Sequence, residues 1–189
     1  MSHLYALVLA AGSGSRFGGG KLMARWRGGA LIDGALQAAM AAPVRGVRVV
    51  AGADPAVRAH VEAWGLTVVE AADHALGLSA SLKAGVASLP PGAAGVLVFL
   101  GDMPLIPHAV LEPLADALEV GALAAAPEFQ GRLGNPVALS KALFPQVLAL
   151  EGDRGARALI EGLGERLVRI PSPDDGILID VDRPDDLPA

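Results

Sequence analysis

Cysteine is absent from this chain of 189 residues. Its absence excludes disulfide bonds, thiolate nucleophiles, and zinc or iron–sulfur sites that are built on cysteine. Long apolar runs are also missing: 52 % of the residues are hydrophobic, yet no run approaches the ~20 residues of a membrane helix. The N-terminus lacks the basic segment of a secretory signal peptide. We therefore expect a cytoplasmic protein that makes no membrane contact.

Charge of either sign is never concentrated in one block. The formal net charge is −5, and the lack of a basic block argues against a surface that binds nucleic acid. No linker rich in Ser or Pro divides the chain, and its length suits one domain. We expect residues 1–189 to form a single domain with one core, and any nucleotide that it binds to be a small one.

Strand-like and helix-like segments alternate along the chain. The continuous apolar run over residues 4–10 is typical of a strand buried on both faces of a parallel sheet. Apolar residues at helical spacing predict a helix over residues 31–42, and Asp54 and Pro55 predict the start of another. Further strands are predicted at residues 47–51, 66–69, 95–100, 123–126, 167–170 and 177–179. This alternation predicts an α/β fold whose doubly wound, mainly parallel sheet lies between two layers of helices, a three-layer αβα arrangement.

A glycine-rich loop with two cations follows the first predicted strand. Its glycines free the backbone to adopt positive φ and to turn N–H groups toward an anion, and Arg16 and Lys21 add positive charge. The dinucleotide-binding fingerprint needs glycine where Phe17 stands, and the Walker-type loop needs Ser or Thr where Leu22 stands. The loop therefore predicts an anion site that is neither a dinucleotide-binding fingerprint nor a Walker-type loop. The alternative is a surface turn with incidental charge.

Carboxylates follow two later segments of the chain. Asp102 comes directly after the predicted strand at residues 95–100, and Asp180 and Asp182 lie near the C-terminus. In open α/β sheets ligands bind beyond the carboxyl ends of the strands, so Asp102 and the glycine-rich loop are expected at one edge. Asp102 could instead be a turn residue before Pro104, and the C-terminal group could be a solvated acidic edge. Cations for phosphate charge and carboxylate oxygens for Mg²⁺ are what nucleotidyl transfer requires.

Six motifs in order give the chain a resemblance to a known family. They read L-A-A-G-S-G-S-R-F-G-G-G-K, G-L-S-A-S-L, G-D-M-P, G-N-P-V, G-D-R-G-A-R and D-V-D-R-P-D-D-L, and the match extends from Leu7 to Leu187. The chain resembles the MobA-like nucleotidyltransferases, and within them the molybdenum cofactor cytidylyltransferases. The resemblance implies a Rossmann-like nucleotidyltransferase fold and an Mg²⁺-dependent enzyme. It also implies transfer of a nucleoside monophosphate, with CMP from CTP favoured, to a phosphorylated acceptor such as molybdopterin, with release of pyrophosphate.

The resemblance assigns roles to residues within these motifs. As catalytic residues, Arg16 and Lys21 would neutralise charge on the leaving pyrophosphate, and Asp102 would hold Mg²⁺. Asp182 would be the second metal carboxylate, although Asp180 is so near in sequence that the two are not strongly separated. The triphosphate would be held by Ala10, Ala11, Gly12, Ser13 and Gly14. The base or ribose would be faced by Gly77, Ser79 and Ser81. The acceptor would be faced by Gly134, Asn135 and Asp153.

Several alternatives stay open at the level of sequence. Ser79, Ser81 and Asp153 could simply cap helices. Cytidylyltransferases commonly carry His in the motif that reads Gly134-Asn135-Pro136 in this chain, which leaves the acceptor and the base open. The acceptor could be a sugar phosphate or an alcohol phosphate. The alternative outside enzymes is an accessory protein that binds a nucleotide and delivers cofactor through transient contact with a molybdoenzyme.

Overall fold

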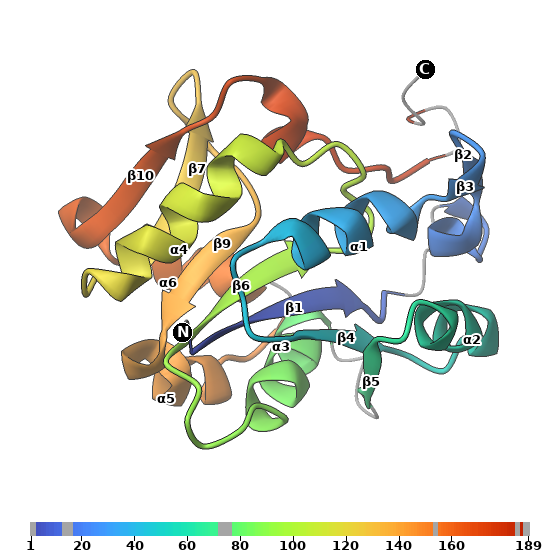
Figure 1. Ribbon diagram of the computed structural model, residues 1–189, viewed down its shortest axis with the longest axis horizontal. Coiled ribbons are helices and arrows are strands. Elements are labelled where there is room, and N and C mark those ends of the chain that lie inside the picture. Colours follow the sequence, from blue (N-terminus) through green and yellow to red (C-terminus); the bar gives the residue numbers. More distant parts are fainter. Residues whose placement is uncertain (1–2, 13–16, 72–76, 153–154, 184–185, 187–189) are drawn as a thin grey trace.

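The computed structural model describes residues 3–12, 17–71, 77–152, 155–183 and 186 (Figure 1). Its main sheet contains β1 (Leu4–Ala10), β4 (Val47–Ala51), β5 (Thr67–Glu70), β6 (Gly95–Leu100), β7 (Ala124–Phe129), β8 (Arg132–Leu133), β9 (Val137–Ser140) and β10 (Leu167–Pro171). The strands lie side by side in the order β10-β7-β9-β6-β1-β4-β5, and β8 pairs with β7. A separate hairpin is formed by β2 (Arg25–Trp26) and β3 (Gly29–Ala30).

The main sheet is mainly parallel, as predicted, but β9 is reversed within it. β1 runs parallel to both of its neighbours, β4 and β6, and β7 runs parallel to β10. β9 runs antiparallel to both β6 and β7. The reversal brings the segment before β9 to the same edge as the segments that follow β1, β4 and β6. The segment before β9 and the segments after β1, β4 and β6 therefore all lie at the edge where α/β sheets bind ligands.

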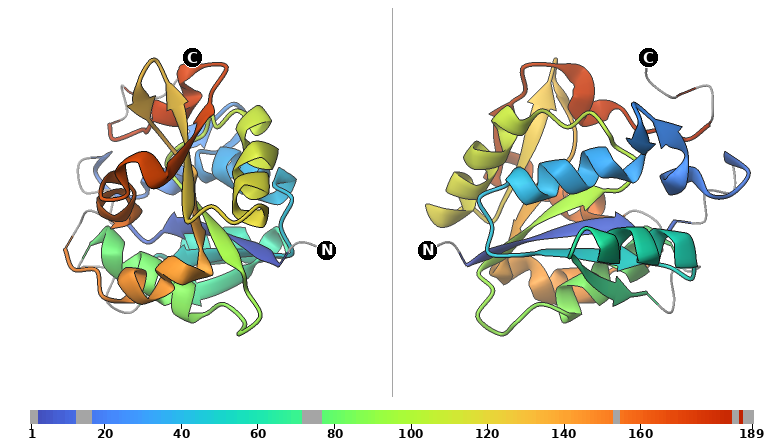
Figure 2. Two further views of the ribbon diagram at one scale, coloured as in Figure 1. Left: turned by 90° about the vertical axis from the view of Figure 1, so that its left-hand side faces the viewer. Right: turned by 45° about the vertical axis from the view of Figure 1, so that its right-hand side comes forward.

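Helices cover both faces of the sheet, which confirms the predicted three-layer arrangement (Figure 2). One face is covered by α1 (Ile32–Ala41), α2 (Pro55–Ala63) and α4 (Leu111–Glu119). The other is covered by α3 (Leu78–Ala87), α5 (Phe144–Leu148) and α6 (Gly155–Glu161). β1 supplies Ala6 and Val8 to the first apolar cluster and Leu7 and Leu9 to the second, as expected of a strand buried on both faces. Among the described residues, no helix combines the length and apolar character needed to cross a membrane.

The segment at residues 177–179 is not the strand that its apolar pattern predicts. It overlaps the 3-10 helix η7 (Asp175–Leu178), at whose start the Asp174 carboxylate accepts a hydrogen bond from the Gly176 N–H at 2.9 Å. Ile177 is fully buried there. The prediction was wrong because a capped turn can bury an apolar side chain as completely as sheet pairing does. Other 3-10 segments are η2 (Lys21–Met23), η4 (His108–Val110), η5 (Lys141–Leu143) and η6 (Gly164–Arg166).

Helix α1 packs closely against the turn that carries Asp102. A Cβ atom added to Gly34 would lie 2.3 Å from the Pro104 carbonyl oxygen and 2.6 Å from its Cα. These are backbone atoms, which cannot move aside as a side chain can. Gly34→Ala is therefore expected to lower the free energy of unfolding by about 2 kcal/mol, as overpacking does, even though alanine usually favours a helix by ~1 kcal/mol over glycine. Urea unfolding measures this change.

The matched control for this substitution is Gly92→Ala. A Cβ atom added to Gly92 would meet nothing within 4 Å. Its unfolding free energy is expected to stay within about 0.5 kcal/mol of the parent value, as for ordinary surface changes. Equal stability of the two variants would show that α1 and the Asp102 turn are not tightly packed.

Candidate active site

Lys21 lies between two of the carboxylates that the sequence singles out. Its Nζ donates to Asp102 Oδ2 at 2.7 Å and to Asp182 Oδ1 at 3.2 Å. The lysine side chain is 12 % exposed, and those of Asp102 and Asp182 are 25 % and 42 % exposed. Gly20, just before Lys21, has φ 63° and ψ 17°, a left-handed conformation that glycine adopts at little cost. Three distant parts of the chain thus bring opposite charges together at the edge of the sheet.

Backbone contacts position both carboxylates. Asp102 lies just beyond β6, and its carbonyl oxygen accepts a hydrogen bond from the Val181 N–H at 3.0 Å. The Asp186 Oδ2 accepts hydrogen bonds from the N–H groups of Asp182 at 3.1 Å and Arg183 at 2.7 Å. Sequence reasoning gave Asp186 no role beyond its place in the motif D-V-D-R-P-D-D-L. In the structure it orients the backbone at Asp182.

The charges at this site act on one another. Burial lowers the pKa of Lys21, but the hydrogen bonds and charges of Asp102 and Asp182 outweigh burial and raise the pKa above its ordinary value. The pKa of Asp180 is raised first by burial and then by the charge of Asp102, with a smaller contribution from Asp182. Asp180 is therefore close enough to Asp102 for their charges to repel each other. A cation bound among these carboxylates would relieve that repulsion.

Asp102 and Asp182 could hold a divalent cation in place of the Lys21 ammonium. Among the described residues, no three His, Cys, Asp or Glu side chains gather into a metal site. Mg²⁺ is usually held by one or two carboxylates, and water and substrate phosphates supply its other ligands. The carboxylate pair therefore fits Mg²⁺ that binds together with a nucleotide, and does not fit a closed structural site such as that of zinc.

A small cavity, the loop cavity, opens beside Lys21 at the carboxyl ends of β1 and β4. Its volume is about 120 Å³, and its lining comprises residues 10–12, 20–22, 52–54 and 57. Sequence reasoning placed Ala10, Ala11 and Gly12 at the site but missed residues 52–54, of which Asp54 was identified only as a helix cap. The same rule that pointed to Asp102 could have found them, since they also follow a buried parallel strand.

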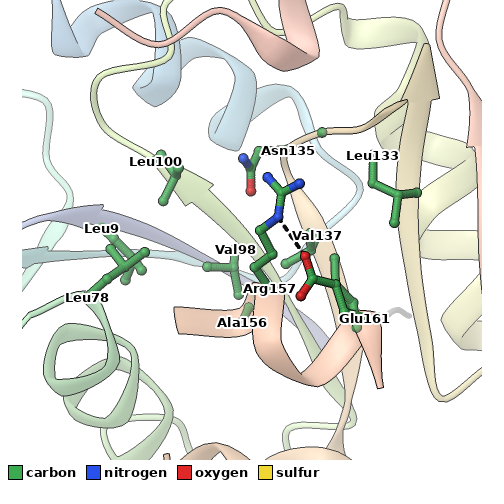
Figure 3. A pocket seen from close by; sticks show the side chains of 12 residues that line it. Leu9, Leu78, Val98, Leu100, Leu133, Asn135, Val137, Ala156, Arg157 and Glu161 are labelled. Atoms are coloured by element: carbon green, nitrogen blue, oxygen red, sulfur yellow. Dashed lines mark hydrogen bonds and ion pairs between the residues drawn. The ribbon is translucent and has the colours of Figure 1, made fainter. Parts of the chain in front are cut away.

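Two neighbouring cavities lie toward the β7 side of the sheet. The apolar cavity has a volume of about 280 Å³ and is lined by eight aliphatic side chains, Asn135, Arg157, Glu161 and one glycine (Figure 3). The arginine cavity has a volume of about 550 Å³, and its charged lining residues are Arg132, Arg157, Arg169 and Asp180. Asn135 and Arg157 line both, so the two cavities adjoin each other.

Asn135 reaches these cavities because β9 is reversed. Its N–H donates to the Ile177 carbonyl at 2.9 Å, and the Gly134 N–H donates to the Pro127 carbonyl at 2.8 Å. A Cβ atom on Gly134 would lie 2.3 Å from the Ile177 carbonyl oxygen, so this close approach requires glycine. The peptide bond between Asn135 and Pro136 is cis. The motif G-N-P-V is thus explained locally by a tight contact between the start of β9 and η7.

The small polar residues of the serine-containing motif contribute to none of the three cavities. Gly77 is the N-cap residue of α3 with φ 101°, and no side chain caps this helix end. Ser79 and Ser81 are buried, at 2 % and 4 % exposure, and line none of the three cavities described above. The Ser79 Oγ has no hydrogen-bond partner among the described residues. Leu78, between these polar positions, lines the apolar cavity.

Four of the predicted site residues lie outside the described part of the chain. They are Ser13, Gly14, Arg16 and Asp153. The roles given to them by resemblance stay predictions.

Comparison with known proteins gives a consistent pattern. Residues 6–169 match the family model described as the MobA-like NTP transferase domain. The chain is 30 % identical to the purine catabolism protein PucB of Bacillus subtilis (strain 168), with 97 % of this chain and 94 % of that protein covered. It is 28 % identical to the molybdenum cofactor cytidylyltransferase of Escherichia coli (strain K12), with 98 % and 94 % covered.

Solved structures share the fold over nearly the full length. A nucleotidyl transferase from Methanothermobacter thermautotroptrophicus has a TM-score of 0.81 at 25 % identity, with 97 % of this chain and 93 % of that chain covered. Rv0371C of Mycobacterium tuberculosis H37Rv, solved in complex with manganese, has a TM-score of 0.80 at 26 % identity, with 97 % and 95 % covered. The Rossmann-like fold of nucleotidyltransferases, predicted from the sequence, is confirmed.

Proposed function

This chain belongs to the MobA-like NTP transferase family, a family of nucleotidyltransferases, and we propose that it transfers CMP from CTP to the terminal phosphate of molybdopterin or a similar acceptor. The observation that carries the proposal is the position of Lys21 between Asp102 and Asp182, beside the loop cavity. This arrangement joins a cation for phosphate charge to two carboxylates for Mg²⁺, as nucleotidyl transfer requires. CTP and molybdopterin are favoured because the Escherichia coli relative is a molybdenum cofactor cytidylyltransferase.

The proposed step exchanges one phosphorus–oxygen bond for another. An oxygen of the acceptor phosphate attacks the α-phosphorus of the nucleotide and forms the new bond. The bond from the α-phosphorus to its bridging oxygen breaks, and pyrophosphate leaves with the bonding electrons. A phosphate monoester is already ionised at neutral pH, so the chain need not supply a general base.

Each charged residue has a defined part in this proposal. The backbone of residues 10–12 holds the triphosphate in the loop cavity. Lys21 exchanges its carboxylate partners for the leaving pyrophosphate, and Arg16 adds positive charge to the same group. When bound by Asp102 and Asp182, Mg²⁺ supplies charge stabilisation of the phosphoryl oxygens.

Binding of the four nucleotides tests the donor side. With Mg²⁺ present, CTP at 100 times its dissociation constant is expected to add ~2.7 kcal/mol of stability. For a chain of this size that amounts to an increase of roughly 5–10 °C in the melting temperature. GTP, ATP and UTP at the same concentration are expected to give smaller increases. If none of the four raises the melting temperature, the proposed nucleotide site is wrong.

Pyrophosphate release distinguishes the remaining alternatives. With CTP, Mg²⁺ and molybdopterin, release above the rate without acceptor is expected. Release with a sugar or alcohol phosphate, and none with molybdopterin, would identify a different acceptor. Thermal stabilisation by a nucleotide without release toward any acceptor would identify a non-catalytic accessory protein.

A further inference from the structure

A partly buried histidine–carboxylate pair joins two helices outside the carboxylate site. His60 Nε2 lies 2.6 Å from Asp33 Oδ1, and the two side chains are 25 % and 17 % exposed. A carboxylate only accepts hydrogen bonds, so His60 is the donor. Asp33 lies in the first turn of α1 and His60 in the last turn of α2, where the helix dipoles favour an anion and a cation respectively. The contact is therefore a firm link between α1 and α2.

Asp33 also holds the hairpin formed by β2 and β3. Its Oδ2 accepts a hydrogen bond from the Ala30 N–H at 2.8 Å, so each carboxylate oxygen has a partner of its own. A Cβ atom added to Gly29 would lie 2.3 Å from Asp33 Oδ2, which shows how closely the hairpin approaches the carboxylate. At the base of the hairpin, the Leu31 N–H donates to the Ala24 carbonyl at 2.9 Å. Asp33 thus fixes the hairpin to the start of α1.

The base of the hairpin is joined directly to the segment that contains Lys21. Ala24 follows η2, and its N–H donates to the Lys21 carbonyl at 3.0 Å. Lys21 and Leu22 both line the loop cavity. Hydrogen bonds between neighbouring residues therefore lead from the Asp33 carboxylate to one wall of the loop cavity.

His60 holds a second wall of the same cavity. Val57, one turn before His60 in α2, lines the loop cavity, as do residues 52–54, which lead into that helix. Helix α2 packs against η2, and Val57 and Leu22 belong to the same apolar cluster. Figure 1 shows α2 and the hairpin at the same end of the sheet. The pair of Asp33 and His60 thus ties together the two elements that bound the loop cavity.

We propose that Asp33 and His60 are positioning residues, whose pair sets the separation of η2 and α2 and thereby the affinity of the loop cavity for a nucleoside triphosphate. The inference rests on the proposed function, because it takes the loop cavity to be the triphosphate site. Neither residue lines any of the three cavities, so both act through the elements that they join. A wall that is already held in place need not be ordered when the nucleotide binds, which lowers the free-energy cost of binding.

Calorimetric titration with CTP and Mg²⁺, and the kinetics of pyrophosphate release, test the proposal. His60→Leu removes the hydrogen-bond donor and is expected to raise both Kd and KM for CTP by about tenfold. The kcat is expected to stay within about twofold of the parent value, because the pair acts equally on the bound substrate and on the transition state. A variant that loses kcat and keeps KM would contradict the proposal.

Two further variants separate the hydrogen bond from the bulk of the side chain. His60→Gln places an amide N–H near the position of Nε2 and is expected to bring Kd for CTP back to within about threefold of the parent value. His108→Leu is the matched control, since His108 is an exposed residue of η4 that lines none of the three cavities. Equal Kd values for the Leu and Gln variants of His60, or an unaltered Kd in both, would overturn the positioning role.

Hydrogen exchange without any nucleotide tests the link itself. In His60→Leu the amides of Ala30 and Leu31 are expected to exchange about tenfold faster, because Asp33 holds the hairpin less firmly once it loses its partner. The increase should exceed that of the β6 amides, which report global unfolding. Equal increases in the hairpin and in β6 would show a general loss of stability and contradict the link.

The parent protein separates this inference from the proposed function. A parent that binds none of the four nucleotides would refute the nucleotidyltransferase proposal, whatever hydrogen exchange shows. A parent that binds CTP and transfers CMP, beside a His60→Leu variant with the same Kd and KM, would refute the positioning role alone. Faster exchange in the hairpin with an unchanged Kd for CTP would show a purely structural link, and would refute that role as well.

Discussion

Asp102→Ala is expected to lower the rate of nucleotidyl transfer by about 10³-fold, because one preorganised electrostatic group at a transition state contributes roughly this much. The carboxylate is one of the two that could hold Mg²⁺, and it is a hydrogen-bond acceptor for Lys21. Its loss should also weaken binding of Mn²⁺, which electron paramagnetic resonance measures without any turnover. Pyrophosphate release at saturating CTP measures the loss in rate.

The fold should survive this substitution. The Asp102 carbonyl oxygen, which accepts the Val181 hydrogen bond, is part of the backbone and stays in place. Asp116→Ala is the matched control, since Asp116 is an exposed residue of α4 that lines none of the three cavities. A folded Asp102→Ala protein with normal activity would refute the metal assignment.

Lys21→Met is expected to act in opposite directions on catalysis and on metal binding. Transfer should slow by about 10²-fold or more, because the leaving pyrophosphate loses a neutralising cation. Affinity of the nucleotide-free protein for Mn²⁺ should rise by about tenfold, because the metal no longer competes with an ammonium group for the two carboxylates. The side chains of both partners are partly exposed, so water screens the competition and keeps the gain modest.

The control for this variant is Lys141→Met. Lys141 is exposed, and its Nζ donates to the Pro91 carbonyl at 2.8 Å, away from the carboxylates. It should leave both the rate of transfer and Mn²⁺ affinity unchanged. If Lys21→Met binds Mn²⁺ no better than the parent protein, the ammonium does not compete for the metal position.

Strand ends were the most predictable part of this molecule. The bounds of β1, β4 and β6 agree with the sequence-based prediction. A continuous apolar run that stops at glycine or a charged turn leaves few alternative positions for the two ends of a strand. The general rule for ligands in α/β sheets then placed Asp102 and the glycine-rich loop at one edge. Lys21 was predicted to face phosphate, and in the structure its Nζ donates to the carboxylates of Asp102 and Asp182.

The features that were missed depend on contacts distant in sequence. The strand β9 is absent from the predicted strands, and local periodicity carries no information on strand direction, so neither β9 nor its reversal was predicted. The rule for strand ends could place residues 52–54 at the ligand edge, but that they line the same cavity as residues 10–12 follows only from β4 lying next to β1. The burial of Ile177 in η7 depends on the tight contact with Gly134. None of these can be read from the residues of one segment alone.

The linings of the cavities divide the chain into two nearly separate stretches. Residues 10–57 supply the whole lining of the loop cavity, whereas the other two cavities take all but Leu9 from residues 78–180. Mutations in one stretch can therefore accumulate with little effect on the other. On the proposed function, the residues that hold the triphosphate and those implied to face the acceptor lie in different stretches, and chimeras of two relatives joined between these stretches would test whether acceptor preference follows the second stretch.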